Sequence, residues 1–553
     1  MLCNYHQAIA QTPNPNSLPT DQLEDIPVTP LAPDVPTQPS DQEQLLPETQ
    51  TPGKDDHNAT FQVDRIEVVG STIFTSEQFT AITSPFVGRK VTFAELLQVK
   101  DAITKLYTDK GYVTTGALIA PQSIEAGVVK IQVVEGSLQD IQITGNNRLQ
   151  DQYIRSRIRL GAKKPLNVPR LLENLQMLRL DPRIQNLSAE LQTGVSLGSN
   201  LLQVKIKEAD TFRLTTTLDN GRSPAVGSLR REVELNEANL LGFGDSLSVG
   251  YSNTDGSNTL NANYTIPINA RNGTVSFSYS QGNNEVIEKP FSVLDIQSKT
   301  RTYELVIRQP LVQKPTQELA MGLSFSRQSS QTELGLDNIG GFPLSPGADA
   351  NGKTKISALR FTQDYTQRSN TQVFAARSQF SLGVDWFGAN INKDAPDSRF
   401  FSWRGQAQWV QQFQPDTLFL VKGDLQAAAD SLVPLEQFGL GGQQSVRGYR
   451  QDALLTDSGI LLSAEFRLPI VRASKIGGVL QLTPFINIGK GWNYNGKNPS
   501  PSMLVGAGLG LLWKQDDNFS ARLDWGIPLI SVEGEKRSLQ ENGLYFSLSY
   551  SPF

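Results

Sequence analysis

Apolar and polar residues alternate at every second position through most of the chain that follows Phe212. Val275, Phe277 and Tyr279, for example, are separated by serines. A period of two is the period of a β-strand that has one apolar and one polar face. Such strands suit a wall between lipid and water. A soluble β-sandwich also alternates, but its inner faces must be rich enough in apolar residues to form a core.

Turn signals divide residues 212–553 into sixteen predicted strands with alternating short and long connectors. Proline suits the ends of strands because it cannot donate a hydrogen bond to the ladder. Short turns are expected at Asn272-Gly273, at Pro310 with Pro315, at Pro415-Asp416 and at Pro469. Longer loops are expected at residues 283–299, 330–352, 388–398 and 430–456. The pattern therefore predicts a 16-stranded antiparallel transmembrane β-barrel over residues 210–553.

The phase of the last strands predicts which side chains face the lumen. Apolar residues share one face of these strands, which leaves Glu465, Asn487 and Asp524 on the other face. Because the apolar face meets lipid, we expect these three polar side chains to point inward. Between them, glycines occupy every second position from Gly506 to Gly510. Since glycine has no side chain, this strip leaves room for an inserted loop.

Within the predicted loop 430–456, the stretch from Glu436 to Tyr449 carries one permanent cation. This stretch is rich in glycine and contains Arg447. An unpaired charge is costly inside a barrel, so we expect Arg447 to have an inward-facing partner. The alternative is an arginine that lies in a surface loop and is solvated.

Residues 61–209 show a different pattern, in which short strands alternate with helices. Thr92 and Glu95 form a capping box, which predicts the start of a helix. The expected elements are strands at 61–69, 128–134, 138–144, 188–193 and 201–207, and helices at 93–109, 150–160 and 168–179. The sequence therefore predicts two tandem α+β domains, at residues 61–136 and 137–209.

The first sixty residues hold ten of the chain's 31 prolines. This composition predicts a disordered or extended segment over residues 1–60. Ala8-Ile9-Ala10 resembles the small-residue end of a secretory signal peptide, but the ten residues are too few for a basic region and an apolar core. The match is therefore either the remnant of a signal peptide that starts upstream or chance.

Composition excludes several classes of function. Only 38% of the residues are hydrophobic, and no run approaches the roughly 18 apolar residues that a spanning helix needs. Cys3 is the only cysteine, and His6 and His57 are the only histidines, so we expect no metal site and no histidine-dependent catalysis. Gly194-Val-Ser-Leu-Gly198 matches a hydrolase motif, but it joins two predicted strands and is interpreted as a hairpin turn. The net charge of −5 with mixed charges predicts no nucleic acid partner, and no cofactor motif is present.

Several motifs resemble known families. Phe61 to Gly70, Lys110 to Thr114, Pro121-Gln122 and Val133 to Gly136 resemble POTRA domains, which are periplasmic modules of outer-membrane transporters. The two POTRA-like domains together with the barrel and its loop resemble the Omp85 superfamily, and in particular its two-partner secretion transporters of the haemolysin and adhesin type. The resemblance covers residues 61–553.

The resemblance implies a role for the arginine loop. In that family the motif formed here by Val446-Arg447-Gly448-Tyr449 folds back into the barrel, and its arginine pairs with an aspartate. This chain has Asn487 at the aligned position, so an Arg–Asn hydrogen bond is expected there. The charge of Arg447 then needs compensation from Glu465 or Asp524.

The C-terminus resembles the assembly signal of outer-membrane barrels. Apolar residues alternate up to Tyr550, and Phe553 closes the chain. Pro552 interrupts the alternation, so Phe553 is out of phase with the apolar positions. The resemblance implies that Phe553 is read by the barrel assembly machinery, although in an irregular form.

The resemblance also implies location and function. We expect an outer-membrane protein of a Gram-negative-type bacterium, with its POTRA domains in the periplasm and its barrel in contact with lipid. The leading hypothesis is that a monomer without enzymatic activity exports a large secreted adhesin or cytolysin, which the POTRA domains bind in extended form. One alternative is an insertase for other barrel proteins, which two POTRA domains disfavour. The other is a passive porin.

Overall fold

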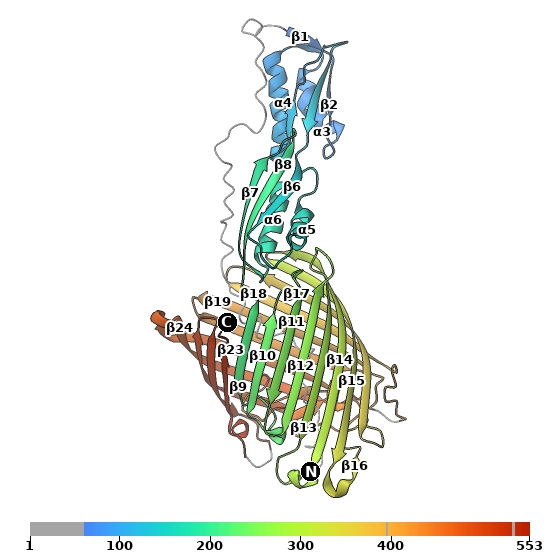
Figure 1. Cartoon of the computed structure of the whole chain (residues 1–553), viewed down its shortest axis with the longest axis vertical. Helices are drawn as coiled ribbons and strands as arrows, with labels where there is room; N and C mark the ends of the chain where they lie inside the picture. The colour runs from blue at the N-terminus through green and yellow to red at the C-terminus, as the bar shows by residue number, and fades with distance from the viewer. Residues whose placement is uncertain (1–59, 394–395, 533–536, 553) are drawn as a thin grey trace. The chain divides into compact units, whose positions relative to one another are not determined.

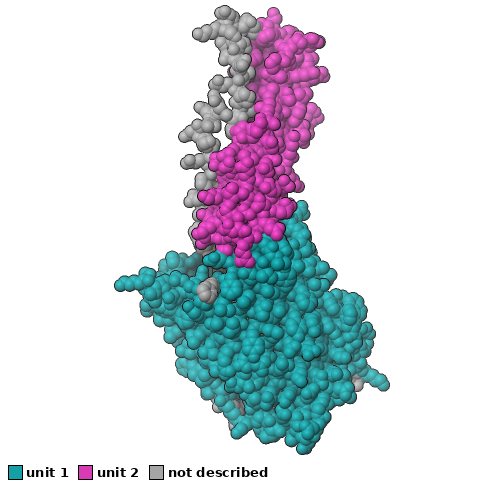
Figure 2. Space-filling view, in the orientation of Figure 1, with its two compact units in different colours: residues 1–32, 210–553 teal, residues 33–209 magenta. Residues whose placement is uncertain are grey.

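A computed structural model describes residues 60–393, 396–532 and 537–552. These residues divide into two compact units, one ending at Ala209 and the other beginning at Asp210 (Figure 2). Residues 1–59 of the predicted N-terminal segment and the predicted signal residue Phe553 lie outside the described residues. Among the described residues, every α-helix belongs to the first unit, and none is long and apolar enough to cross a membrane.

The first α+β domain packs its helices against a small sheet. Its elements are β1 (Thr60–Val63), β2 (Arg65–Val69), α3 (Ser76–Thr83), β3 (Arg89–Thr92), α4 (Phe93–Thr108), β4 (Gly116–Leu118) and β5 (Val128–Val134). β5 is the central strand, parallel to β2 and antiparallel to β4. The predicted capping box is present, since the Glu95 N–H donates to Thr92 Oγ1 (3.2 Å) and the Thr92 N–H donates to Glu95 Oε2 (2.7 Å).

Several details of this domain differ from the sequence prediction, which did not include the short strands β3 and β4. The single strand expected over 61–69 is divided into β1 and β2, because the chain bends at Asp64, whose N–H donates to the carbonyl oxygen of Gly127 (2.8 Å). The sequence reading also missed α3. This helix has eight residues and buries only Phe79 and Thr83, so its apolar period is too short to recognise.

The second α+β domain repeats this architecture. Its elements are β6 (Ser137–Thr144), α5 (Asp151–Gly161), α6 (Val168–Arg179), β7 (Ile184–Thr193) and β8 (Ser199–Glu208). β8 is the central strand, and both helices contribute to one apolar core with it. Residues 194–198 connect β7 to β8, which confirms that the hydrolase-like motif is a hairpin turn.

Hydrogen bonds join the two α+β domains within their unit. Asn167 Nδ2 donates to the carbonyl oxygen of Lys110 (3.0 Å), and the Val168 N–H donates to the carbonyl oxygen of Gly111 (3.0 Å). Asn167 also caps α6, because its Oδ1 accepts from the Arg170 N–H (3.2 Å). The start of α6 is therefore tied to the end of the first domain.

The second unit is a closed antiparallel barrel (Figure 1), which confirms the predicted fold class and strand number. The sixteen long strands are β9 (Phe212–Asp219), β10 (Arg230–Glu237), β11 (Ser246–Asn253), β12 (Ser257–Pro267), β13 (Thr274–Glu285), β14 (Ile296–Lys314), β15 (Gln317–Leu334), β17 (Lys353–Arg368), β18 (Gln372–Val384), β19 (Phe401–Gln414), β20 (Thr417–Ala428), β23 (Ser458–Ala473), β24 (Gly478–Trp492), β25 (Met503–Gln515), β26 (Phe519–Pro528) and β27 (Leu544–Tyr550). β27 closes the ring by pairing with β9, and the two-residue β16 (Gly340–Gly341) pairs with the end of β15.

The wall has the two faces that the alternation predicted. In β23, the outward side chain of Leu462 is 51% exposed, whereas the inward side chain of Glu465 is 7% exposed. Trp525 and Asp524 in β26 show the same contrast between an exposed apolar and a buried polar side chain. Polar residues are buried inside and apolar residues are exposed outside, as expected for a barrel in lipid and the reverse of a soluble sandwich.

One predicted turn is wrong and another is right only in part, because the turn between β14 and β15 lies at Pro315 and does not include Pro310. Pro310 lies inside β14 and Pro469 lies inside β23. The register shifts by one residue after each proline, before Val312 and Val471 respectively. The unpaired residues are Leu311 and Ile470, each directly after a proline, and the disrupted ladder at such a bulge tolerates a neighbour that cannot donate a hydrogen bond. Proline therefore marked irregularities within strands as well as their ends.

Candidate functional site

The connection between β20 and β23, residues 429–457, folds into the barrel. We call it the lumen loop. It contains a short hairpin of β21 (Phe438–Leu440) and β22 (Leu454–Thr456), which the sequence reading missed because three-residue strands have no readable period. Its buried residue Val446 packs in an apolar cluster that includes Leu504 of the wall. The lumen loop thus has a small core of its own inside a polar lumen.

The predicted glycine strip contacts this loop. A Cβ atom added at Gly506 would lie 1.9 Å from the carbonyl oxygen of Arg447, and one added at Gly526 would lie 2.6 Å from the nitrogen of Gly448. Gly448 itself has φ +106°, a conformation that side chains disfavour. Glycine is therefore required on both sides of this contact, where two backbones approach closely.

Arg447 lies at the centre of the site, and its side chain contacts all three of the predicted lumen residues. Its Nε donates to Asn487 Oδ1 (3.1 Å), and its Nη1 donates to Glu465 Oε2 (2.8 Å). The same Nη1 lies 3.6 Å from Asp524 Oδ2. The guanidinium also stacks on Phe485, with its Cζ 3.4 Å from the ring centre. Arg447 is only 4% exposed, so these contacts replace its solvation.

Two further arginines complete a charge cluster around Glu465. Arg467 Nε donates to Glu465 Oε1 (3.1 Å), and Arg522 Nη2 donates to Glu465 Oε2 (2.6 Å). Arg522 Nε also donates to Asp524 Oδ2 (2.8 Å). We call these five residues the lumen cluster: Arg447, Arg467, Arg522, Glu465 and Asp524. Three cations face two carboxylates, so the cluster carries a net charge of +1 with the neutral Asn487 beside it.

The sequence reading missed two aromatic residues of the site, Phe485 and Tyr545. Tyr545 Oη donates to the carbonyl oxygen of Tyr449 (2.6 Å) and accepts from the Gly448 N–H (2.8 Å). The Tyr449 hydroxyl lies 2.9 Å from the carbonyl oxygens of Val505 and Ile530. Both missed residues are aromatic side chains on the inward face of a strand, which is the signal that could have identified them.

Ion pairs also hold the lumen loop at two other points. Arg360 of β17 pairs with Glu436 at the start of the loop (2.6 Å). Arg450 pairs with Glu288 (2.9 Å) and with Glu541 (3.2 Å), which lie in the connections before β14 and before β27. Ion pairs thus hold the lumen loop against strand β17 and against two other connections of the barrel. Water could replace these contacts if the loop moved.

An open space remains next to the lumen loop. This cavity has a volume of about 670 Å³ and is lined by residues of several strands, among them β12, β13, β19 and β20, and by loop residues such as Gln443 and Asp452. No group of side chains in the described part of the chain has the arrangement of a metal site. The lumen therefore offers a polar passage that the loop narrows.

Comparisons with known proteins agree with this architecture. Residues 198–512 match the family model of the haemolysin secretion/activation protein ShlB/FhaC/HecB, and residues 61–136 match that of the POTRA domain, ShlB-type. The chain is 24% identical over 513 residues to the outer membrane transporter CdiB of Escherichia coli O6:K15:H31. This alignment covers 88% of this chain and 83% of the relative. It is also 24% identical over 469 residues to the heme/hemopexin transporter protein HuxB of Haemophilus influenzae. This second alignment covers 79% of this chain and 78% of the relative.

The solved structure of CdiB from Escherichia coli shares the fold. It superimposes with a TM-score of 0.67 at 21% sequence identity and covers 92% of this chain and 94% of that chain. The family model alone spans more than half of the residues. The chain therefore belongs to the ShlB/FhaC/HecB family of haemolysin secretion/activation proteins, which are two-partner secretion transporters of the Omp85 superfamily, with a barrel in the outer membrane and POTRA domains in the periplasm.

Proposed function

We propose that this transporter recognises a large secreted protein through its POTRA domains and exports it in extended form through the barrel. The observation that carries the proposal is the lumen loop. It occupies the passage, yet hydrogen bonds, ion pairs and a small apolar cluster hold it there without any covalent link. A loop held in this way can be displaced by a passing polypeptide.

The sheets of the POTRA domains support the capture step. In the described residues, β2 and β4 are the edge strands of the first sheet, and β6 and β7 are those of the second. An edge strand leaves backbone N–H and C=O groups free to pair with an added strand. Val69 and Ile73 lie at and just after the end of β2 and are exposed, so an extended segment could also bury apolar surface there.

The inward face of the barrel supports the passage step. Displacement of the loop would expose the lumen cluster and the polar residues of the wall to water. Because these side chains are charged or polar, water can hydrate them again, which limits the cost of opening. A lumen lined by apolar side chains would instead bind the unfolded segments of a partner tightly and retain them.

Replacement of Arg447 tests the proposal. We expect Arg447→Ala to reduce export of the large secreted partner, because the lumen loop loses its contacts with Glu465, Asn487 and Phe485. Export is measured as partner protein in the medium, and barrel assembly is measured by heat-modifiable electrophoresis. Arg472→Ala is the matched control, since Arg472 is an exposed arginine that pairs with Asp416 near a short turn.

Normal export by an assembled Arg447→Ala barrel would refute the role of the loop. Loss of other barrel proteins from the membrane on depletion of the transporter, with export of the partner unchanged, would favour an insertase instead.

A further inference from the structure

Five cationic side chains gather on the outward face of three neighbouring strands. We call them the basic patch: Lys299 and Arg301 of β14, Arg327 of β15, and Lys353 and Lys355 of β17. They have the same phase as the exposed apolar residues of the wall. In β14, Tyr303 and Leu305 follow Arg301 at every second position and are exposed, whereas Thr300 and Glu304 are buried on the inward face. The basic patch therefore faces away from the lumen.

The strand register arranges these cations around Ser329 of β15. Ser329 lies opposite Arg301 on one side and opposite Lys355 on the other. Since neighbouring strands are about 4.8 Å apart, the backbones of Arg301 and Lys355 are roughly 10 Å apart. Arg327 lies two residues before Ser329 on the same face of β15.

The next row of the sheet repeats the arrangement. Gln331 lies opposite Lys299 on β14 and opposite Lys353 on β17. Long, flexible side chains from both rows can reach a single group placed over Ser329. The patch thus has the geometry of a converging site with five positive charges.

These charges have no carboxylate partners in the described part of the chain. None of the five side chains forms an ion pair with a described residue. The nearest acidic residues on β15 and in the adjoining loop make other contacts, since Glu333 accepts from Gln331 Nε2 (2.9 Å) and Asp349 accepts from the backbone N–H of Lys353 (2.9 Å). The outward face therefore keeps an excess of positive charge.

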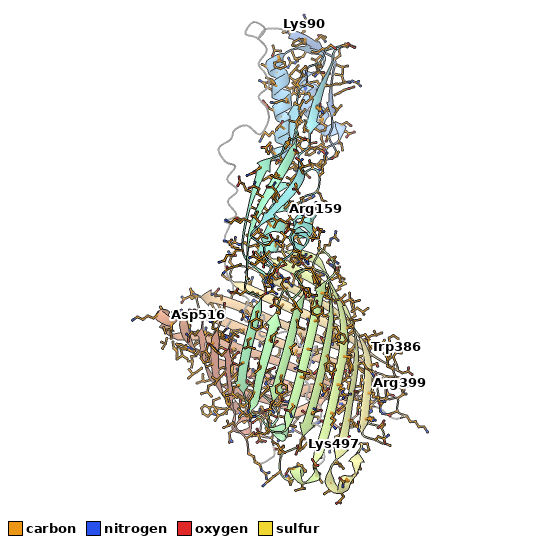
Figure 3. All side chains as sticks on the ribbon, viewed as in Figure 1. Lys90, Arg159, Trp386, Arg399, Lys497 and Asp516 are labelled. Atoms are coloured by element: carbon orange, nitrogen blue, oxygen red, sulfur yellow. The ribbon has the colours of Figure 1, made fainter. Side chains whose placement is uncertain are left out.

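An aromatic belt lies directly beside the basic patch. Tyr303, which is opposite Arg327, packs against Tyr279 with ring centres 5.1 Å apart. Phe325 packs against Trp386 (6.0 Å) and Phe387 (5.5 Å), and Figure 3 shows Trp386 at the outer edge of the barrel. Aromatic girdles mark the boundary between the acyl chains and the headgroups of a membrane. The patch lies on the side of this belt toward the long connections, which are extracellular in outer-membrane barrels.

We propose that the basic patch binds the phosphorylated headgroup of a glycolipid in the outer leaflet. A phosphate group over Ser329 would accept charge-assisted hydrogen bonds from Arg301 and Arg327, whose guanidinium groups match phosphate geometry, and from the lysines around them. The acyl chains would lie along Tyr303, Phe325 and the apolar residues below them. This site is separate from the export pathway, because it lies on the lipid-facing side of the wall.

Native mass spectrometry of the full chain, titrated with lipid A, tests the proposal. Lipid A is a glucosamine disaccharide with two phosphates and several acyl chains. We expect the double variant Arg301→Gln/Lys355→Gln to bind it at least tenfold more weakly, because each cation near an anionic group contributes roughly fivefold to binding. The charge-preserving variant Arg301→Lys/Lys355→Arg is expected to stay within about threefold of the parent chain.

Controls separate this site from general charge effects and from other lipids. Lys475→Gln/Lys497→Gln removes the same charge from exposed positions outside the patch and should leave lipid A binding unchanged. Dephosphorylated lipid A should bind the parent chain no better than lipid A binds the glutamine variant.

Three results would overturn the proposal. The first is equal binding of lipid A by the parent chain and an assembled Arg301→Gln/Lys355→Gln barrel. The second is an equal loss of binding in the Lys475→Gln/Lys497→Gln control. The third is equally tight binding of phosphatidylglycerol by the parent chain, which would rule out selection of the outer-leaflet glycolipid.

Discussion

The substitution Asn487→Asp addresses the main peculiarity of the lumen cluster, which is its net positive charge. Asn487 is almost fully buried, and its Oδ1 accepts from Arg447 Nε (3.1 Å) and from the Arg447 N–H (3.3 Å). An aspartate at this position keeps the acceptor and adds a negative charge, so that three arginines face three carboxylates. We expect the substitution to hold the lumen loop more firmly in its folded-back position.

The size of the effect follows from the change in the type of hydrogen bond. A hydrogen bond to a charged acceptor contributes about 1.5–3 kcal/mol, compared with about 0.5–1.5 kcal/mol for a neutral one. Burial of the new carboxylate is offset by the excess positive charge that surrounds it. Asn487 Nδ2 now donates to Ser463 Oγ (2.6 Å), and the Ser463 hydroxyl can instead donate to the aspartate. A net gain of about 1–2 kcal/mol corresponds to a factor of roughly 5 to 30 in the equilibrium of the loop.

Single-channel recording in planar bilayers measures this equilibrium. We expect the parent chain to show large conductance steps as the loop moves, and the Asn487→Asp variant to remain closed roughly 5 to 30 times longer between openings. Asn487→Ala should shorten the closed periods, because Arg447 loses its amide partner. Asn261→Asp adds the same charge to the inward face of β12, away from the cluster, and should change the closed periods little.

Closed periods that are unchanged or shorter in Asn487→Asp than in the parent chain would refute the reasoning. They would show that the charge balance around Arg447 does not determine how long the lumen loop stays in its folded-back position. A bilayer that remains silent with the parent chain would count against a pore.

Further predictions concern the loop contact and the POTRA domains. Gly506→Ala places a methyl group 1.9 Å from the Arg447 carbonyl oxygen, so the lumen loop should be displaced and become more accessible to protease. Asn167→Ala removes both a helix cap and the hydrogen bond to Lys110 and should destabilise α6 by about 1–2 kcal/mol, measured as faster hydrogen exchange in its first turn. Burial raises the pKa of Tyr107 from 10.0 to about 12. As the pH rises, Tyr107 loses its proton at a lower pH in the unfolded chain than in the folded domain. The stability that the protonated Tyr107 side chain contributes is therefore complete below about pH 10 and is lost as the pH approaches 12. Thermal unfolding of Tyr107→Phe, followed by circular dichroism of the helices, should depend less on pH in that range.

Much of the fold could be predicted because the wall of a membrane barrel is a local pattern. Each strand meets lipid on one side and water on the other, so the alternation of apolar and polar residues shows which side chains face the lumen. Glu465, Asn487 and Asp524 were assigned to the lumen from this alternation. The bounds of the helix at 168–179 were also predicted correctly, since a helix too is a local element. Short elements such as α3 and β21 were missed because they contain too few residues to show a period.

The arrangement of the contacts around Arg447 could not be predicted in the same way, because it depends on the register between distant segments. Glu465 follows Arg447 by 18 residues and Asn487 by 40, and Tyr545 lies 97 residues beyond Gly448. The sequence by itself determined that the loop carries a permanent cation and that Glu465, Asn487 and Asp524 lie on the polar face of their strands. Only the tertiary structure decided that Glu465 is shared by three arginines, that Phe485 stacks on the guanidinium and that glycines of β25 and β26 admit the loop, since these contacts arise when a closed ring of strands brings remote positions to the same depth of the lumen.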